Sequence, residues 1–162
     1  MSAVKFREAT AEDVGLILQF IRALAEYEKM SGDVVATEEI LREWLFEKNS
    51  ARVIFAMEGE KEVGFALYFY NFSTFLGRAG LYLEDLFVLP EYRGRGYGKG
   101  LLAHLAAMAV ERGCGRMEWV CLDWNQPSID FYKSKNAVSL DDWTIYRLTG
   151  ETLTAFAKED KA

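Results

Sequence analysis

The clearest amphipathic pattern of the chain lies near its start. Thr10 can cap a helix there, with Asp13 returning the bond as in a capping box. The pattern breaks at residues 31–33, so we expect this helix to end at about Tyr27. Its apolar residues recur three and four positions apart, at Val14, Ile17, Leu18, Ile21, Leu24 and Ala25.

Stretches of β-forming residues alternate with turn and helix signals along the rest of the chain. Residues 58–61 have turn chemistry between two such stretches, which predicts an antiparallel hairpin. The complete order predicts a mixed α/β fold in one domain, residues 1–162, with helices on both faces of a sheet. The predicted strands are 4–7, 52–57, 62–72, 81–89, 117–122 and 143–148, and the predicted helices are 10–27, 37–46, 98–112 and 126–135.

A glycine-dense segment lies between the strand at 81–89 and the helix that follows it. Successive backbone N–H groups in such a loop can converge on an anion, and the helix start adds the positive end of a dipole. Glycines allow the backbone to approach phosphates closely. The segment therefore predicts a phosphate site in Arg93-Gly94-Arg95-Gly96-Tyr97-Gly98-Lys99-Gly100.

Two common nucleotide motifs do not fit this segment. In a P-loop, Arg93 would stand where the first glycine is required, and Gly100 where the hydroxyl that binds Mg²⁺ is required. In a dinucleotide fingerprint the third glycine would fall on Lys99, and the preceding elements do not form a βαβ unit. The phosphate ligand must therefore be of another kind.

Residues 93–98 fit the R/Q-x-x-G-x-G/A signature with which GNAT proteins hold the pyrophosphate of coenzyme A. The match continues in LYLEDLFV at 81–88, in DWNQPSIDFYK at 123–133, and in LAEYE at 24–28. The chain thus resembles the GNAT superfamily of N-acetyltransferases over nearly its whole length. Within it, the chain is similar to the spermidine/spermine and thialysine acetyltransferase branch.

This resemblance implies the GNAT fold, a mostly antiparallel central sheet that splays at its middle strands. It also implies an enzyme that uses acetyl-CoA and no metal. The amine would attack the thioester directly, and the acceptor would be the primary amine of a small molecule, either a diamine or polyamine or a thialysine- or lysine-like amine.

The resemblance assigns two catalytic residues. Tyr132 matches the family's general acid, and its phenol, protonated at pH 7, can give a proton to the departing thiolate. Glu84 matches a residue that binds the amine and relays its proton through water. Consecutive side chains of a strand face opposite sides, so Glu84 and Asp85 should point apart, and we take Glu84 as the one that faces the substrate. From the residues alone, Glu84 could also be a salt-bridged carboxylate, and Tyr132 one of eight tyrosines that cap a core.

Binding residues carry over from the family in the same way. Tyr27 and Glu28 offer an aromatic face and a carboxylate to an ammonium ion, although periodicity alone places them at the solvated end of a helix. The substrate-binding set is Tyr27, Glu28, Ser73 and Glu84. The coenzyme-binding set comprises the backbone of Leu86, Phe87 and Val88, which can pair with the pantetheine amides like a neighbouring strand, together with Arg93, Gly94, Arg95, Gly96, Tyr97, Gly98, Lys99, Asn125, Ser128 and Tyr132.

The sequence departs from the family pattern at several positions. Ser73 stands where polyamine-specific members carry an acidic residue, while residues 122–123 look more like the thialysine side of the branch. Asn136 replaces the usual glycine, and asparagine tolerates a left-handed backbone. A shortened segment leaves open whether Asp141 or Asp142 contacts the substrate.

The amino-acid composition limits which partners and metal sites the protein can have. The chain of 162 residues is 51% hydrophobic and 14% aromatic, enough to build a core without covalent staples. A net charge of −6 argues against nucleic acid, because neutralising phosphates requires clustered Lys and Arg. The two cysteines and the single His104 cannot form a disulfide framework or a four-ligand zinc site, so we expect free thiols and a structural histidine.

The start of the chain has no apolar signal region, and the longest apolar run, residues 63–70, is too short to span a bilayer. We therefore expect a cytoplasmic protein without a membrane partner. The branch implies a homodimer, which could bury Phe69, Phe72 and Phe75 across its two-fold axis. Two rival functions stay open: acetylation of a protein N-terminus or lysine, and acyl-CoA binding without catalysis. The presence of both Tyr132 and Glu84 argues against the second.

Overall fold

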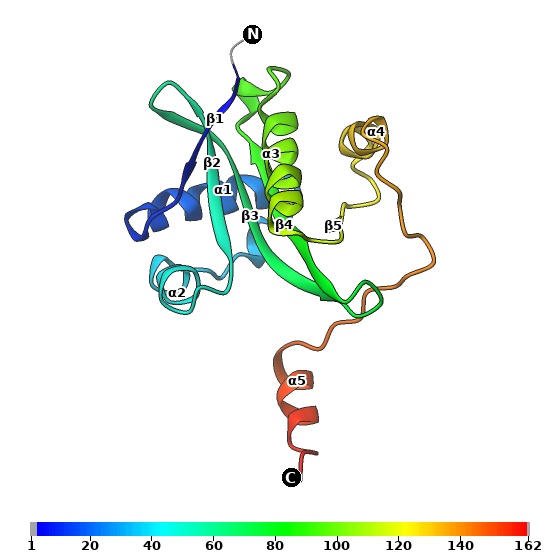
Figure 1. Ribbon diagram of the computed structural model, residues 1–162. Coiled ribbons are helices and arrows are strands. Elements are labelled where there is room, and N and C mark those ends of the chain that lie inside the picture. The colour runs from blue at the N-terminus through cyan, green and yellow to red at the C-terminus, as the bar shows by residue number, and fades with distance from the viewer. Residues whose placement is uncertain (1–2, 162) are drawn as a thin grey trace. The chain divides into compact units, whose positions relative to one another are not determined.

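A five-stranded sheet forms the framework of the protein, which we describe from a computed structural model covering residues 3–161 (Figure 1). Its strands follow one another in chain order, the first four pairing antiparallel and the fifth parallel to the fourth. This confirms the predicted mixed α/β fold with a mostly antiparallel sheet. The strands are β1 (Lys5–Glu8), β2 (Arg52–Glu58), β3 (Lys61–Ser73), β4 (Arg78–Val88) and β5 (Met117–Glu118).

The helices begin and end close to the predicted residues. The Thr37 hydroxyl accepts a hydrogen bond from the Ile40 N–H at 3.2 Å and so caps the second helix, which continues as a π-helix over Arg42–Glu47. Short 3₁₀ turns lie at Ala11–Asp13, Ser31–Asp33 and Pro90–Tyr92. The α-helices are α1 (Val14–Tyr27), α2 (Glu38–Leu41), α3 (Tyr97–Arg112), α4 (Gln126–Ser134) and α5 (Gly150–Ala157).

Helices cover both faces of the sheet, as predicted. On one face α1 and α2 enclose a core with β2, β3 and β4, while α3 packs on the other face, where a side chain at Gly64 would meet both Val88 of β4 and Leu101 of α3. Figure 1 shows α1 and α3 on opposite sides of the strands. The core under α1 and α2 consists of Val14, Ile17, Leu18, Phe20, Leu41, Leu45, Val53, Phe55, Phe65 and Phe87.

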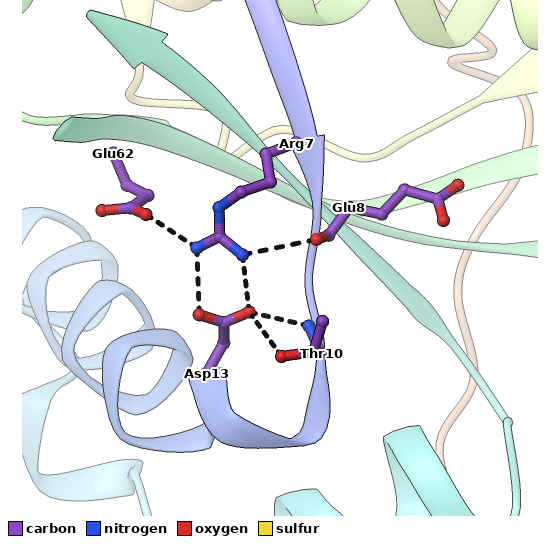
Figure 2. Close-up of polar contacts among 5 residues, drawn as sticks. All are labelled: Arg7, Glu8, Thr10, Asp13 and Glu62. Carbon is purple, nitrogen blue, oxygen red and sulfur yellow. Dashed lines mark hydrogen bonds and ion pairs between the residues drawn. The ribbon is translucent and has the colours of Figure 1, made fainter. Parts of the chain in front are cut away.

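A charged network fixes the start of α1 to the sheet (Figure 2). The Arg7 guanidinium of β1 donates to both carboxylate oxygens of Asp13 at 2.9 Å and to Glu62 of β3 at 2.7 Å. Asp13 also accepts the Thr10 N–H at 2.7 Å, which confirms the predicted capping box. Hydrogen bonding to Arg7 holds the pKa of Asp13 below its ordinary value, so this carboxylate is ionised at neutral pH.

The end of the chain differs from the sequence prediction. The structure divides into two compact units, one up to Val120 and one from Cys121 onward. The strand predicted at 117–122 is formed only over Met117–Glu118, and the strand predicted at 143–148 is absent, since none of those residues joins the sheet of the described chain. Instead, α5 follows, with Thr149 at its N-cap and Glu151 in its first turn, a helix signal that our sequence analysis missed.

The missing strand has a physical explanation. Trp143, Ile145 and Tyr146 have β propensity, and their side chains are 80%, 71% and 92% exposed. Propensity alone does not form a strand, because the backbone must also pair with the edge of a sheet. Residues 143–148 have the β propensity, but no strand edge of the described sheet pairs with them.

Candidate active site

The glycine-rich loop joins β4 to α3. Gly94 and Gly96 adopt left-handed backbone angles, with φ of 76° and 90°, and Gly96 is the N-cap of α3. No heavy atom would lie within 4 Å of a Cβ added at either glycine, so the backbone is exposed on this side. The first N–H groups of a helix have no partner within it, so the start of α3 offers donors and a positive dipole end to an anion. This geometry fits the predicted phosphate site.

Side chains hold this loop in place. Arg95 and Tyr97 both contact the Glu58 carboxylate at the end of β2, at 3.3 Å and 3.1 Å. Gly98 lies against β4, where an added Cβ would lie within 4 Å of Leu86 and Val88, so it permits close packing of helix on strand. The backbone at Gly94 and Gly96 and the exposed side chain of Lys99 are available to a ligand.

The end of β4 has an open edge. One side of β4 pairs with β3 along its length, but β5 pairs with it only at Leu81 and Tyr82. Among the described residues, no strand pairs with that second edge from Leu83 onward. This separation of β5 from β4 corresponds to the predicted splay, and it leaves one edge of the backbone at Leu86, Phe87 and Val88 without a described strand beside it. The pairing of this edge with pantetheine amides stays a prediction.

A bulge interrupts β4 just before this open edge. Asp85 lies opposite Leu67 of β3, whereas Leu83 lies opposite the next residue, Tyr68, so Glu84 is inserted in the pairing. Residues directly opposite one another point to the same side of a sheet. Asp85 therefore shares a face with Leu67, which packs against the core under α1. Leu83 lies opposite Tyr68 on the other face, so residues 83 and 85, which would share a face in a regular strand, point to opposite sides of the sheet.

Asp85 lies in an acidic environment. It is half-buried, and burial, together with the charges of Glu84 and Glu28, raises its pKa from an ordinary 3.8 to about 6. Glu28, the C-cap of α1, is also half-buried, and burial raises its pKa. Glu84 is exposed. No hydrogen bond or ion pair from within residues 3–161 reaches any of these three carboxylates. From the sequence we took Glu84, and not Asp85, as the carboxylate that faces the substrate. The bulge that turns Asp85 toward α1 is visible only in the pairing of β4 with β3.

Aromatic residues border the acidic group. The ring of Tyr27, at the end of α1, lies 6.3 Å from that of Phe87, measured between centroids. The Arg93 guanidinium lies over both rings, at 4.9 Å and 5.0 Å, and its Nε donates to the Val88 carbonyl at 3.0 Å. The structure thus brings together Tyr27, Glu28 and Asp85 on the α1 side of β4.

Ser73 has a different environment. It is 4% exposed at the end of β3, and its hydroxyl accepts the Leu76 N–H at 3.2 Å, which closes the turn into β4. This contact gives the buried hydroxyl a hydrogen-bond partner. Its role in substrate binding stays a prediction.

The remaining predicted residues belong to the second unit. Asn125 is the N-cap of α4 and is 8% exposed, while Ser128 and Tyr132 are half-buried on that helix. The Tyr132 carbonyl accepts the N–H groups of Lys135 and Ala137 where the helix ends. Asn136 has a φ of 62°, which confirms that it takes the left-handed conformation expected of the usual glycine.

The single histidine and the two cysteines lie outside the acidic group. His104 of α3 stacks on Phe6 of β1, with ring centroids 4.3 Å apart. Cys114 and Cys121 are not joined in a disulfide. Within the described part of the chain, His, Cys, Asp and Glu side chains form no group of three that could hold a metal ion. Nor does that part contain a helix with the length and apolar character needed to cross a membrane.

Comparison with known proteins agrees with this geometry. Residues 18–136 match the model of the acetyltransferase (GNAT) family. The thialysine N-epsilon-acetyltransferase of Bos taurus is 39% identical over 97% of this chain and 99% of its own length. The L-ornithine N5-acetyltransferase NATA1 of Arabidopsis thaliana is 44% identical over 59% of this chain and 42% of its own length. Among solved structures, an integron cassette protein from the mobile metagenome of V. cholerae superposes with a TM-score of 0.80 at 31% identity, covering 98% of this chain and 99% of that one.

The family match covers most of the chain, and the loop, the open strand edge and the fold agree with it. Family membership also implies acetyl-CoA as the donor, which the exposed loop backbone at Gly94 and Gly96 fits. The chain therefore belongs to the GNAT acetyltransferase family and is an N-acetyltransferase.

Proposed function

We propose that this protein transfers an acetyl group from acetyl-CoA to the primary amine of a small molecule, with residues 1–162 working as one domain. The observation that carries the proposal is the group of three carboxylates, Glu28, Glu84 and Asp85, beside the open edge of β4. A site with this much negative charge and no cationic partner in the described chain suits an ammonium ion.

Among amines, we favour the side-chain amine of a lysine-like amino acid, and place diamines and polyamines second. Two relatives are named for thialysine and ornithine, which are amino acids with a side-chain amine. Ser73, the position that is acidic in polyamine-specific members, uses its hydroxyl in a turn. The distal ammonium of a polyamine would therefore lack a carboxylate at that position.

The roles of the residues follow from their chemistry. When bound, acetyl-CoA supplies a thioester that is open to attack by an amine. The N–H groups at Gly94, Gly96 and the start of α3 would bind its pyrophosphate, and the β4 edge at residues 86–88 would bind its amides. Lys99 would add charge, while Asn125 and Ser128 would position the remainder of the coenzyme.

Two side chains would handle charge and protons. Glu84 would hold the ammonium, with Tyr27 and Glu28 beside it, and the proton of the ammonium would leave before the attack. The Tyr132 hydroxyl would give its proton to the departing sulfur. Both roles come from the family resemblance.

An acetyl-CoA turnover assay over lysine analogues, ornithine, diamines, polyamines and peptides tests this function. The best substrate should be a small amine. Turnover of peptides alone would favour protein acetylation instead, and coenzyme binding without turnover of any amine would indicate a non-catalytic binding module.

A matched pair of glycine variants tests the coenzyme site. Gly96 and Gly113 lie at opposite ends of α3 with similar φ, 90° and 82°, and each would have no heavy atom within 4 Å of an added Cβ. Gly96→Glu and Gly113→Glu should therefore carry similar backbone strain. Only Gly96→Glu should weaken acetyl-CoA binding, roughly tenfold or more, by placing a carboxylate where the pyrophosphate binds. Equal affinities in the two folded variants would contradict the site.

We also propose that the protein is a homodimer in the reducing cytoplasm. Phe72, near the end of β3, is 61% exposed, and Phe75, in the turn between β3 and β4, is 102% exposed. Such exposed apolar side chains are commonly buried in an interface. A reducing compartment would keep Cys114 and Cys121 out of disulfides. Light scattering that reports 18.5 kDa at micromolar concentration would contradict the dimer.

A further inference from the structure

The β4 bulge leaves one carboxylate without an assigned role. Phe65 lies opposite Phe87, and Leu67 lies opposite Asp85, so Asp85 and Phe87 occupy the same face of the sheet. Phe87 belongs to the core under α1, and its ring lies beside that of Tyr27. Asp85 is therefore directed to the side of β4 on which α1 ends.

Two acidic side chains and an apolar one lie around Asp85, on its own strand and on the neighbouring elements. Glu84 contributes a negative charge from the same strand, and Glu28 contributes one from the end of α1. From the loop after β4, the Arg93 guanidinium lies over the Tyr27 and Phe87 rings and donates to the Val88 carbonyl. It forms no ion pair with Asp85. On the opposite strand, β3 presents the apolar Leu67. The ionised form of Asp85 is thus both partly desolvated and repelled.

We propose that Asp85 is a catalytic residue, the proton acceptor for the amine in the acetyl transfer, an assignment that rests on the proposed function. The substrate ammonium would bind between the carboxylates and give one proton to an Asp85 oxygen, directly or through water. This transfer cancels the positive charge on nitrogen and the negative charge on Asp85. Glu84 would remain ionised and hold the ammonium until the transfer.

The acetyl transfer itself forms one bond, breaks one bond and moves two further protons. The nitrogen lone pair forms the new N–C bond as the C–S bond breaks, and the sulfur leaves with the Tyr132 proton. A second N–H proton is lost from nitrogen and returns to Tyr132 through solvent. Asp85 releases its proton to water and becomes ionised for the next cycle.

The surroundings of Asp85 favour it over Glu84 for this step. A desolvated carboxylate beside like charges accepts a proton more readily than an exposed one, because protonation removes both the desolvation cost and the repulsion. Its raised pKa of about 6 also lies nearer to neutral pH, where a general base works most efficiently.

Kinetics of three variants test the assignment: Asp85→Asn, Asp85→Glu and the control Glu111→Gln, which removes an exposed charge on α3. We expect Asp85→Asn to lower kcat by about 10²–10⁴, the usual contribution of a general base, with acetyl-CoA affinity unchanged. The fall in kcat on the acidic side of the pH profile, near pH 6, should disappear. Asp85→Glu should recover part of the rate and restore that dependence, and Glu111→Gln should match the wild type.

A measurement without substrate checks the same residue. Carbon-13 NMR titration of the carboxyl groups, with Asp85→Asn to assign the signal, should find that Asp85 titrates near pH 6. An Asp85→Asn enzyme with the kcat and acidic pH dependence of the wild type would refute the assignment alone. A wild-type protein that turns over no amine would refute the proposed function and this assignment together.

Discussion

Asp85→Asn should stabilise the folded protein at alkaline pH. Folding raises the pKa of Asp85 from 3.8 to about 6, so the folded state binds this proton more tightly than the unfolded state does. The stability due to protonated Asp85 is then fully present below about pH 4 and is lost as the pH rises through 6. A shift of about two pKa units corresponds to about 3 kcal/mol, which is the upper estimate of the cost of ionised Asp85 at pH 8.

Asparagine keeps the shape of the side chain and removes the charge, but its amide still needs hydrogen-bond partners. We therefore expect a gain of about 1–3 kcal/mol in the free energy of unfolding at pH 8 and almost none at pH 4. For a chain of this length, each kcal/mol raises the Tm by roughly 2–4 °C.

Thermal unfolding followed by circular dichroism between pH 4 and pH 8 measures this difference. Comparison with Glu111→Gln removes effects that come only from net charge, since Glu111 is exposed on α3. The gain should appear between pH 4 and pH 7 and then level off. A gain that is equal at pH 4 and pH 8, or a loss of stability at pH 8, would refute the buried, repelled state of Asp85.

Substitutions at Tyr132, Asp13 and Thr37 test the catalytic acid, the charged network at the start of α1 and the cap of α2. Tyr132→Phe should lower kcat by about 10²–10⁴, with acetyl-CoA affinity nearly intact. The control Tyr146→Phe, at a 92% exposed residue in the same unit, should have no effect. A Tyr132→Phe enzyme with wild-type kcat would exclude Tyr132 as the acid. Asp13→Asn should destabilise the fold by about 1 kcal/mol at pH 7, because Arg7 lowers the pKa of Asp13, and the loss should fade on acidification as the wild-type carboxylate is protonated; urea unfolding with the same midpoint shift at both pH values would contradict this. Thr37→Ala should cost about 1 kcal/mol by removing the cap of α2, whereas Thr37→Ser should retain the stability measured by urea unfolding.

Local chemistry along the chain determined much of the fold. The helix at 14–27 and its Thr10–Asp13 capping box involve residues only a few positions apart, so both can be predicted from the sequence alone. The same holds for the glycine loop and for Asn136, whose left-handed backbone follows from its own side chain and turn. These motifs also carried the family resemblance, and with it the enzyme class.

Other features depend on contacts between distant residues. Arg7 joins Asp13 to Glu62, which lies 55 positions away, and no local pattern indicates that pairing. Residues 143–148 have the side chains of a strand, but a strand exists only where a sheet edge accepts its backbone hydrogen bonds.

The acidic group is the clearest case of a site that tertiary structure decided. From the sequence, Glu84 and Asp85 must alternate across a regular strand, so only one of them could face the substrate. The pairing of β4 with β3 inserts Glu84 as a bulge, and α1 ends with Glu28 close to Asp85. The raised pKa of Asp85 arises from that burial and repulsion, which exist only after segments more than fifty residues apart have come together.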